Sequence, residues 1–141
     1  MTTIVATKNG IYADTLCSYS VPFKVGKVAT IGKSVFAGAG DLDDLTRFFE
    51  WRRGGGKTVD APSLDDGIDV LEVCADGIFI WGKKLVRLKI NQDVYAVGSG
   101  SQYAIGALAF GATPEQAIEV AAKFDTQTAL PIEFVKFRKV K

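Results

Sequence analysis

The chain has 141 residues, of which 48% are hydrophobic and 23% are charged, and these values are typical of one globular, soluble domain over residues 1–141. Lys and Arg total 17 against 16 Asp and Glu, which leaves a net charge of +1. So small a charge provides no field to recruit nucleic acid or an anionic membrane, and we expect neither as a partner.

Two β-hairpins are predicted at the start of the chain. The first has Asn9-Gly10 at its turn, which is the strongest short hairpin signal, and the second has Gly32-Lys33. The segments that pair are residues 3–8 with 11–16, and residues 27–31 with 34–39.

An amphipathic helix is predicted next, over residues 41–53. Acidic residues crowd its first turn, where they favour the positive end of the helix dipole. The loop that follows contains Gly54-Gly55-Gly56-Lys57-Thr58, which resembles the end of a phosphate-binding loop. It follows a helix and has Trp51 where that motif needs glycine, so we do not expect ATP there. The predicted inner face of the helix is Leu42, Leu45, Phe48 and Phe49.

The second half of the chain alternates strands with a pair of helices. Thr113 is a predicted N-cap, with Pro114 at the first helical position and Gln116 completing a capping box. This order is not a regular βαβ alternation, so we expect two antiparallel sheets covered by helices. The predicted strands are 68–73, 78–81, 85–90, 94–97 and 131–137, one helix is 102–110, and the inner face of the second helix is Ala117, Ile118, Ala121 and Phe124.

The sequence contains no histidine. This excludes Ser-His-Asp and Cys-His hydrolases and zinc sites with histidine ligands. Cys17 and Cys74 lack metal-ligand spacing, so we expect small buried side chains, with no metal and no cofactor. No apolar run approaches 18 residues and residues 1–4 do not resemble a signal peptide, so we expect a cytoplasmic protein. Any catalysis must rely on lysine, carboxylates, hydroxyls, thiols or the amino terminus.

The first residues, Met1-Thr2-Thr3-Ile4, offer such a chemistry. Removal of Met1 before a small residue leaves Thr2 with a free α-amine. A threonine hydroxyl is a poor nucleophile without a base, and an α-amine with a pKa of about 7.7–8 can act as that base. Thr2 would then supply both the nucleophile and the base.

Further segments occur in an order that resembles the proteasome β-subunit and HslV family of N-terminal-nucleophile hydrolases. The resemblance implies an α+β fold with a four-layer αββα sandwich. The chain is shorter than that family between its first helix and Gly98, where relatives have a second long helix. The matching segments are Tyr12-Ala13-Asp14-Thr15, Lys27-Val28, Phe36-Ala37-Gly38-Ala39-Gly40-Asp41, Val97-Gly98-Ser99-Gly100-Ser101 and Phe124-Asp125-Thr126-Gln127-Thr128.

The resemblance also implies a role for each matching residue. Thr2 is the nucleophile, Lys27 favours its alkoxide, and Asp14 holds Lys27 oriented and charged. The oxyanion would be stabilised by backbone N–H groups at Ala37 and Gly38. The network that positions the amine and a water is then expected to consist of Ser99, Asp125 and Thr128.

By the same resemblance, the function is that of a threonine-type endopeptidase subunit in a homo-oligomeric ring or double ring. Its substrate would be protein or peptide, and a separate ATP-dependent unfoldase would be its partner. The alternative is a non-catalytic ring or assembly protein with the same fold.

Overall fold

The computed structural model describes residues 2–17 and 23–139. No helix in these ranges is long and apolar enough to cross a membrane. The elements in chain order are β1 (Thr3–Thr7), β2 (Gly10–Asp14), β3 (Leu16–Cys17), β4 (Phe23–Lys24), β5 (Val28–Ile31), β6 (Ser34–Gly40), α1 (Leu42–Arg53), a 3₁₀ turn (Thr58–Asp60), β7 (Ile68–Cys74), β8 (Gly77–Trp81), β9 (Arg87–Ile90), β10 (Val94–Gly98), α2 (Ser101–Ala109), α3 (Pro114–Phe124) and β11 (Ile132–Lys136).

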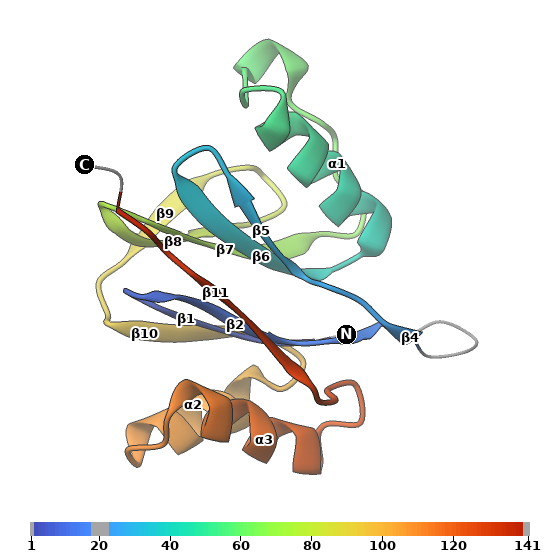
Figure 1. Ribbon diagram of the computed structural model, residues 1–141. Helices are drawn as coiled ribbons and strands as arrows, with labels where there is room; N and C mark the ends of the chain where they lie inside the picture. The colour runs from blue at the N-terminus through green and yellow to red at the C-terminus, as the bar shows by residue number, and fades with distance from the viewer. Residues whose placement is uncertain (1, 18–22, 140–141) are drawn as a thin grey trace.

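Two antiparallel sheets lie face to face, and helices cover their outer faces (Figure 1). One sheet has the strand order β10-β1-β2-β11 and the other has β5-β6-β7-β8-β9. Helix α1 lies over the second sheet, whereas α2 and α3 lie together under the first (Figure 1). The predicted four-layer αββα sandwich is therefore confirmed.

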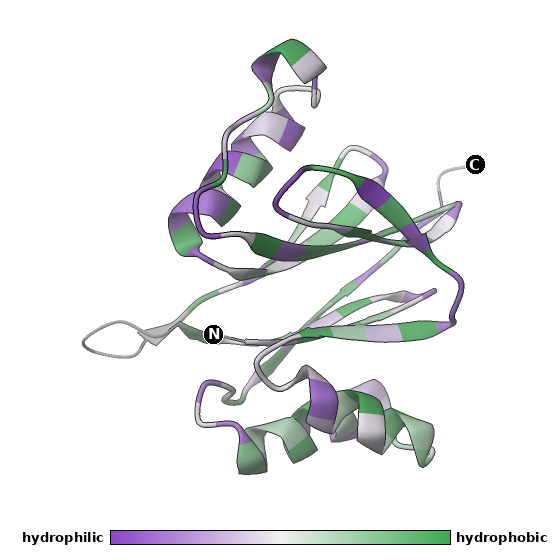
Figure 2. Cartoon of the chain, turned by 180° about the vertical axis from the view of Figure 1, so that it is seen from behind, coloured by the Kyte–Doolittle hydropathy of each residue, from purple (hydrophilic) through white to green (hydrophobic). Residues whose placement is uncertain are grey.

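The main core lies between the two sheets. It is formed by side chains that alternate along the strands, such as Ile4 and Ala6 of β1 against Val35 and Ala37 of β6. The residues between them in the sequence point outward, because successive side chains of a strand face opposite sides of its sheet. Figure 2 shows hydrophobic residues interspersed with hydrophilic ones along the strands of both sheets.

Each outer face of the sandwich has its own smaller core. Phe48 of α1 is fully buried and packs with Phe36, Val70 and Trp81 on the outer face of one sheet. On the opposite side of the sandwich, Val5 and Ala96 pack against Ala104, Ala117 and Ile118 of the α2–α3 pair. The two outer cores hold the helices against the sheets, and the central core holds the two sheets together.

Several sequence predictions for single elements are confirmed, including the Thr113 capping box and the Gly32-Lys33 turn. The first hairpin differs by one residue. Its turn residues are Lys8 and Asn9, and Gly10 is already paired with Thr7 as the first residue of β2. Gly10 has a φ of 148° there, a backbone conformation that glycine adopts readily.

Four residues predicted to be buried are not. Phe124 is the last residue of α3 and is 65% exposed, and its ring stacks on Tyr103. Leu42 is exposed because it occupies the first turn of α1. Cys17 and Cys74 are free thiols, and both are only partly buried. The segment between α1 and β10 contains a 3₁₀ turn and strands β7 to β9.

Candidate active site

Thr2, Asp14 and Lys27 meet at one end of the space between the sheets. Thr2 immediately precedes β1 and Asp14 ends β2, and the antiparallel pairing of these strands brings the two residues together. Lys27 comes from the other sheet, directly before β5. The Thr2 hydroxyl donates to Asp14 Oδ1 and accepts from Lys27 Nζ. The ammonium also lies 2.8 Å from Asp14 Oδ1, so the three polar groups contact one another.

The Asp14 carboxylate is completely buried and is held by backbone donors as well. Its Oδ1 accepts from the Thr3 N–H at 3.1 Å, and its Oδ2 accepts from the N–H groups of Leu16 at 3.3 Å and Ala129 at 3.1 Å. A buried carboxylate needs such partners, since an unpaired buried charge is strongly unfavourable. The backbone therefore fixes the anion against which Lys27 and Thr2 are placed.

A second polar network lies on the other side of Thr2. Asp125 Oδ2 accepts from Ser99 Oγ and from Thr128 Oγ, each at 2.6 Å. Since the Thr128 proton is used in that bond, Thr3 Oγ donates to Thr128 Oγ, also at 2.6 Å. Ser99 Oγ lies 3.4 Å from the carbonyl oxygen of Thr2. The network thus reaches the backbone of the candidate nucleophile.

Hydrogen bonding sets the charge of Asp125. Burial by itself would raise the pKa of this carboxyl, but hydrogen bonds from Ser99 and Thr128 and from the Gln127 N–H lower its pKa overall. Donors to a carboxylate stabilise its charged form. Asp125 is therefore an anion at neutral pH and acts as the acceptor for both hydroxyls.

The turn that carries Ser99 needs both of its glycines. Gly98 has a φ of 100°, and a Cβ built there would lie 1.9 Å from the Thr2 carbonyl oxygen. A Cβ at Gly100 would lie 2.0 Å from Thr3 Oγ. Any side chain at either position would displace the residues around Thr2. The two glycines therefore let the turn backbone lie close to Thr2 and Thr3.

A pocket of about 580 Å³ opens beside Thr2 and Lys27. One wall comes from α1, and the opposite wall comes from residues near β3 and β5. A second pocket, of about 570 Å³, lies between the β5–β6 turn and β11, and none of the predicted site residues, all of which the structure describes, lines it. The side chains that line the first pocket include Leu42, Leu45, Thr46 and Phe49 of α1, together with Leu16, Cys17 and Val25.

The two residues predicted for the oxyanion hole lie differently with respect to this pocket. Gly38 lines it, whereas the Ala37 side chain is buried in the core between the sheets. The β5–β6 ladder ends at the Val28–Ala37 pair, but β7 continues to pair with β6 as far as Gly40. Within residues 2–17 and 23–139, no strand therefore pairs with β6 beyond Ala37 on the side of Lys27.

Solved structures with the same architecture match almost the entire chain. BPH from Thiobacillus denitrificans in complex with epoxomicin has a TM-score of 0.63 at 24% identity, covering 97% of this chain and 98% of that chain. A second structure of BPH from the same organism has a TM-score of 0.64 at 23% identity, with the same coverage of both chains. For HslV from Trypanosoma brucei the TM-score is 0.66 at 15% identity, and the match covers 96% of this chain and 97% of that chain. The chain has the HslV fold.

The predicted resemblance to HslV and the proteasome β-subunit is thus confirmed at the level of the fold. No protein-family model and no curated protein matches the sequence. In this HslV fold, the predicted residues Thr2, Asp14 and Lys27 form one cluster, and Ser99, Asp125 and Thr128 form another beside it. Their catalytic roles stay predictions.

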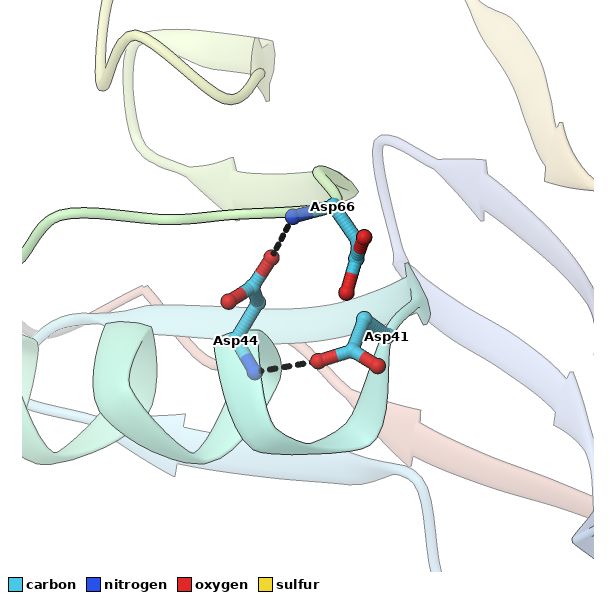
Figure 3. Close-up of side chains that lie close together, drawn as sticks. All are labelled: Asp41, Asp44 and Asp66. Atoms are coloured by element: carbon cyan, nitrogen blue, oxygen red, sulfur yellow. Dashed lines mark hydrogen bonds between the residues drawn. The ribbon is translucent and has the colours of Figure 1, made fainter.

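Near the pocket, Asp41, Asp44 and Asp66 bring their carboxylates within 4.8 Å of one another (Figure 3). Asp44 is buried and accepts N–H groups from residues 65–67 at 2.8 to 3.2 Å, while Asp41 caps α1 through the Asp44 N–H. The bond from Gly67 is the largest influence on the pKa of Asp44, which is lowered even though burial opposes this. The cluster fastens the turn before β7 to the start of α1.

Several contributors to the site were not predicted from the sequence. Thr3 donates its N–H to Asp14 and its hydroxyl to Thr128, and the N–H of Ala129 supports Asp14. Glu133 of β11 accepts from the backbone before β5. A backbone N–H donor cannot be recognised from the type of its residue, because every residue except proline has one. The direction of the Thr3 side chain could have been predicted only from the alternation of side chains along β1, which places it on the same face as Val5.

Proposed function

We propose that this chain is a threonine-type endopeptidase in which Thr2 becomes the nucleophile once the residue before it has been removed. The observation that carries the proposal is the contact of the Thr2 hydroxyl with both Lys27 Nζ and Asp14 Oδ1 in a buried setting. A hydroxyl beside a fixed ammonium is stabilised when it develops negative charge. No histidine is required.

The proposed reaction begins with the free α-amine of Thr2 taking the proton of its own hydroxyl. The oxygen then bonds to the carbonyl carbon of the substrate, and the resulting oxyanion is stabilised by backbone N–H groups. When the C–N bond breaks, the proton passes to the leaving amine and an ester of Thr2 remains. Water, deprotonated by the same amine, hydrolyses this ester and regenerates Thr2.

The neighbouring residues suit each step. The charge of Lys27 opposes protonation of the nearby amine and so favours its basic form. The free edge of β6 beyond Ala37 supports Gly38, rather than Ala37, as the site of the oxyanion donor. The Asp125 network, through Ser99, supports a fixed position for the backbone of Thr2. The pocket beside Thr2 is large enough to receive a substrate side chain.

The similar structure of BPH from Thiobacillus denitrificans is a complex with epoxomicin. Epoxomicin is an epoxyketone. An epoxyketone can bond to both the hydroxyl and the amine of an N-terminal threonine. We therefore expect it to modify Thr2 of this chain. Intact mass should show loss of Met1 and the addition of one inhibitor, and peptide mapping should locate the addition at Thr2.

The matched variants are Thr2→Ala, which should abolish both peptide hydrolysis and modification, and Thr58→Ala, at an exposed position outside the pocket, which should change neither. Modification at Cys17, which lines the same pocket, would instead indicate a thiol mechanism. A chain that lacks Met1, assembles and yet neither hydrolyses peptides nor reacts would favour the non-catalytic ring or assembly protein.

The proposal includes assembly into a homo-oligomeric ring or double ring in the cytoplasm, fed by a separate ATP-dependent unfoldase. Its support is the apolar surface of the outer helices, where Tyr103, Ile105 and Phe124 are exposed and Phe110 is 97% exposed. Figure 2 shows hydrophobic residues along much of the α2–α3 pair, on a side of the sandwich that no further layer covers. Apolar surface of this kind is typical of subunit contacts.

A further inference from the structure

Glu133 connects the two sheets of the sandwich at the edge next to the candidate site. It belongs to β11, an edge strand of one sheet, and β5 is an edge strand of the other. Glu133 Oε1 accepts the Val28 N–H at 2.8 Å and the Lys27 N–H at 3.2 Å. One carboxylate oxygen therefore holds two successive N–H groups at the point where the chain enters β5.

This contact supports the backbone at Lys27. The ladder between β5 and β6 begins only at the Val28–Ala37 pair, so Lys27 lies just outside it. A Cβ at Gly26 would lie 2.9 Å from Glu133 Oε2, so the absence of a side chain there leaves room for the carboxylate. The segment before β5 is shaped to receive this side chain.

The same strand also determines the position of the partner of Lys27. In the β11–β2 ladder, Ile132 pairs with Asp14 and Glu133 pairs with Ala13. Strand β11 thus holds Asp14 through the sheet and holds Lys27 through the Glu133 side chain. The separation of the ammonium from the carboxylate depends on both attachments.

We propose that Glu133 is a positioning residue for the reaction, acting through the backbone of Lys27. This inference rests on the proposed threonine-peptidase function. A lysine side chain is long and flexible, so its ammonium stays beside Thr2 only if its backbone is fixed. Because a misplacement of about 1 Å can cost about 10²-fold in rate, loss of this attachment should lower kcat by roughly 10- to 10²-fold. KM should change little, since Glu133 does not line the pocket.

The test compares Glu133→Ala with Glu133→Gln. Glutamine keeps an oxygen acceptor at the same position, so it should restore most of the lost kcat, whereas alanine should not. Glu119→Ala, on the exposed side of α3, is the matched control for loss of a glutamate and should behave like the wild type. Amide hydrogen exchange in the same proteins should be faster at Lys27 and Val28 in Glu133→Ala alone.

Each alternative outcome is distinguishable. Wild-type kcat in Glu133→Ala, with faster exchange at Lys27 and Val28, would overturn the positioning role, because the contact would be lost without effect. If Glu133→Gln fails as fully as Glu133→Ala, the charge matters rather than the acceptor, and the proposal is wrong.

An inactive wild-type protein would refute the peptidase and not this contact. NMR of the Lys27 ammonium protons then provides the readout. These protons should be protected from exchange in the wild type and in Glu133→Gln, and unprotected in Glu133→Ala. Equal protection in all three proteins would overturn the inference.

Discussion

Replacing Lys27 by methionine removes the ammonium and keeps much of the side-chain length. The side chain of Lys27 is only 10% exposed and that of Asp14 is not exposed at all. Removal of one partner from a buried ion pair typically costs about 3–5 kcal/mol. Here the N–H groups of Thr3, Leu16 and Ala129 still bind the carboxylate. We therefore expect a loss of stability at or below the low end of that range, about 2–3 kcal/mol.

Lys27→Met should also reduce the rate of catalysis, and this effect can be measured separately from the loss of stability. Loss of one preorganised electrostatic partner typically costs about 10²–10³ in rate, equivalent to about 3–4 kcal/mol. Lys27→Arg keeps the charge but replaces a compact ammonium by a broad fork, so it should also lose activity. Hydrolysis of a fluorogenic peptide gives kcat and KM, measured well below the melting temperature of every variant.

A double-mutant cycle with Asp14→Asn isolates the ion pair. Once Asp14 is neutral, the additional Lys27→Met change should cost less stability than it does alone, with a coupling of about 1–3 kcal/mol between the two. Urea unfolding at one fixed protein concentration provides the measurement, because assembly makes apparent stability depend on concentration. A coupling near zero, or wild-type kcat in Lys27→Met, would refute the reasoning.

Three further predictions concern residues outside the reaction. Burial would raise the pKa of Glu72, but hydrogen bonds, above all from Arg87, lower it overall. The ionised Glu72 therefore stabilises the folded protein above its ordinary pKa of 4.5, and this contribution is lost as pH falls through the lower pKa of the folded state. Glu72→Gln should thus cost about 1–2 kcal/mol at pH 7, since Arg87 is partly exposed, and the difference should vanish in acid unfolding curves. Asp44→Asn should speed amide exchange at residues 65–67, and unchanged exchange would contradict its role as their acceptor. Phe110→Lys should shift sedimentation toward smaller species, whereas an unchanged oligomer would remove α2 from the interface.

The sequence determines the local elements and the order in which they occur. Turn residues, the Thr113 capping box and the alternation within strands depend on neighbours in the chain, and the structure confirms most of them. The missing histidine already restricts the chemistry to lysine, carboxylates, hydroxyls, thiols and the amino terminus. Motif order was enough to predict the fold, because each segment occurs at a matching place along the chain.

Contacts between distant segments are decided only by the tertiary structure. The family resemblance predicted the contact of Lys27 with Asp14. It did not predict that this ion pair is shielded from solvent, or that Glu133, more than 100 residues later, binds the Lys27 backbone. The failed prediction for Phe124 has the same origin, since helical periodicity gives the direction of a side chain and not what packs against it. Burial and backbone hydrogen bonds depend on how the two sheets pack, and residue types alone do not encode which edge strands meet.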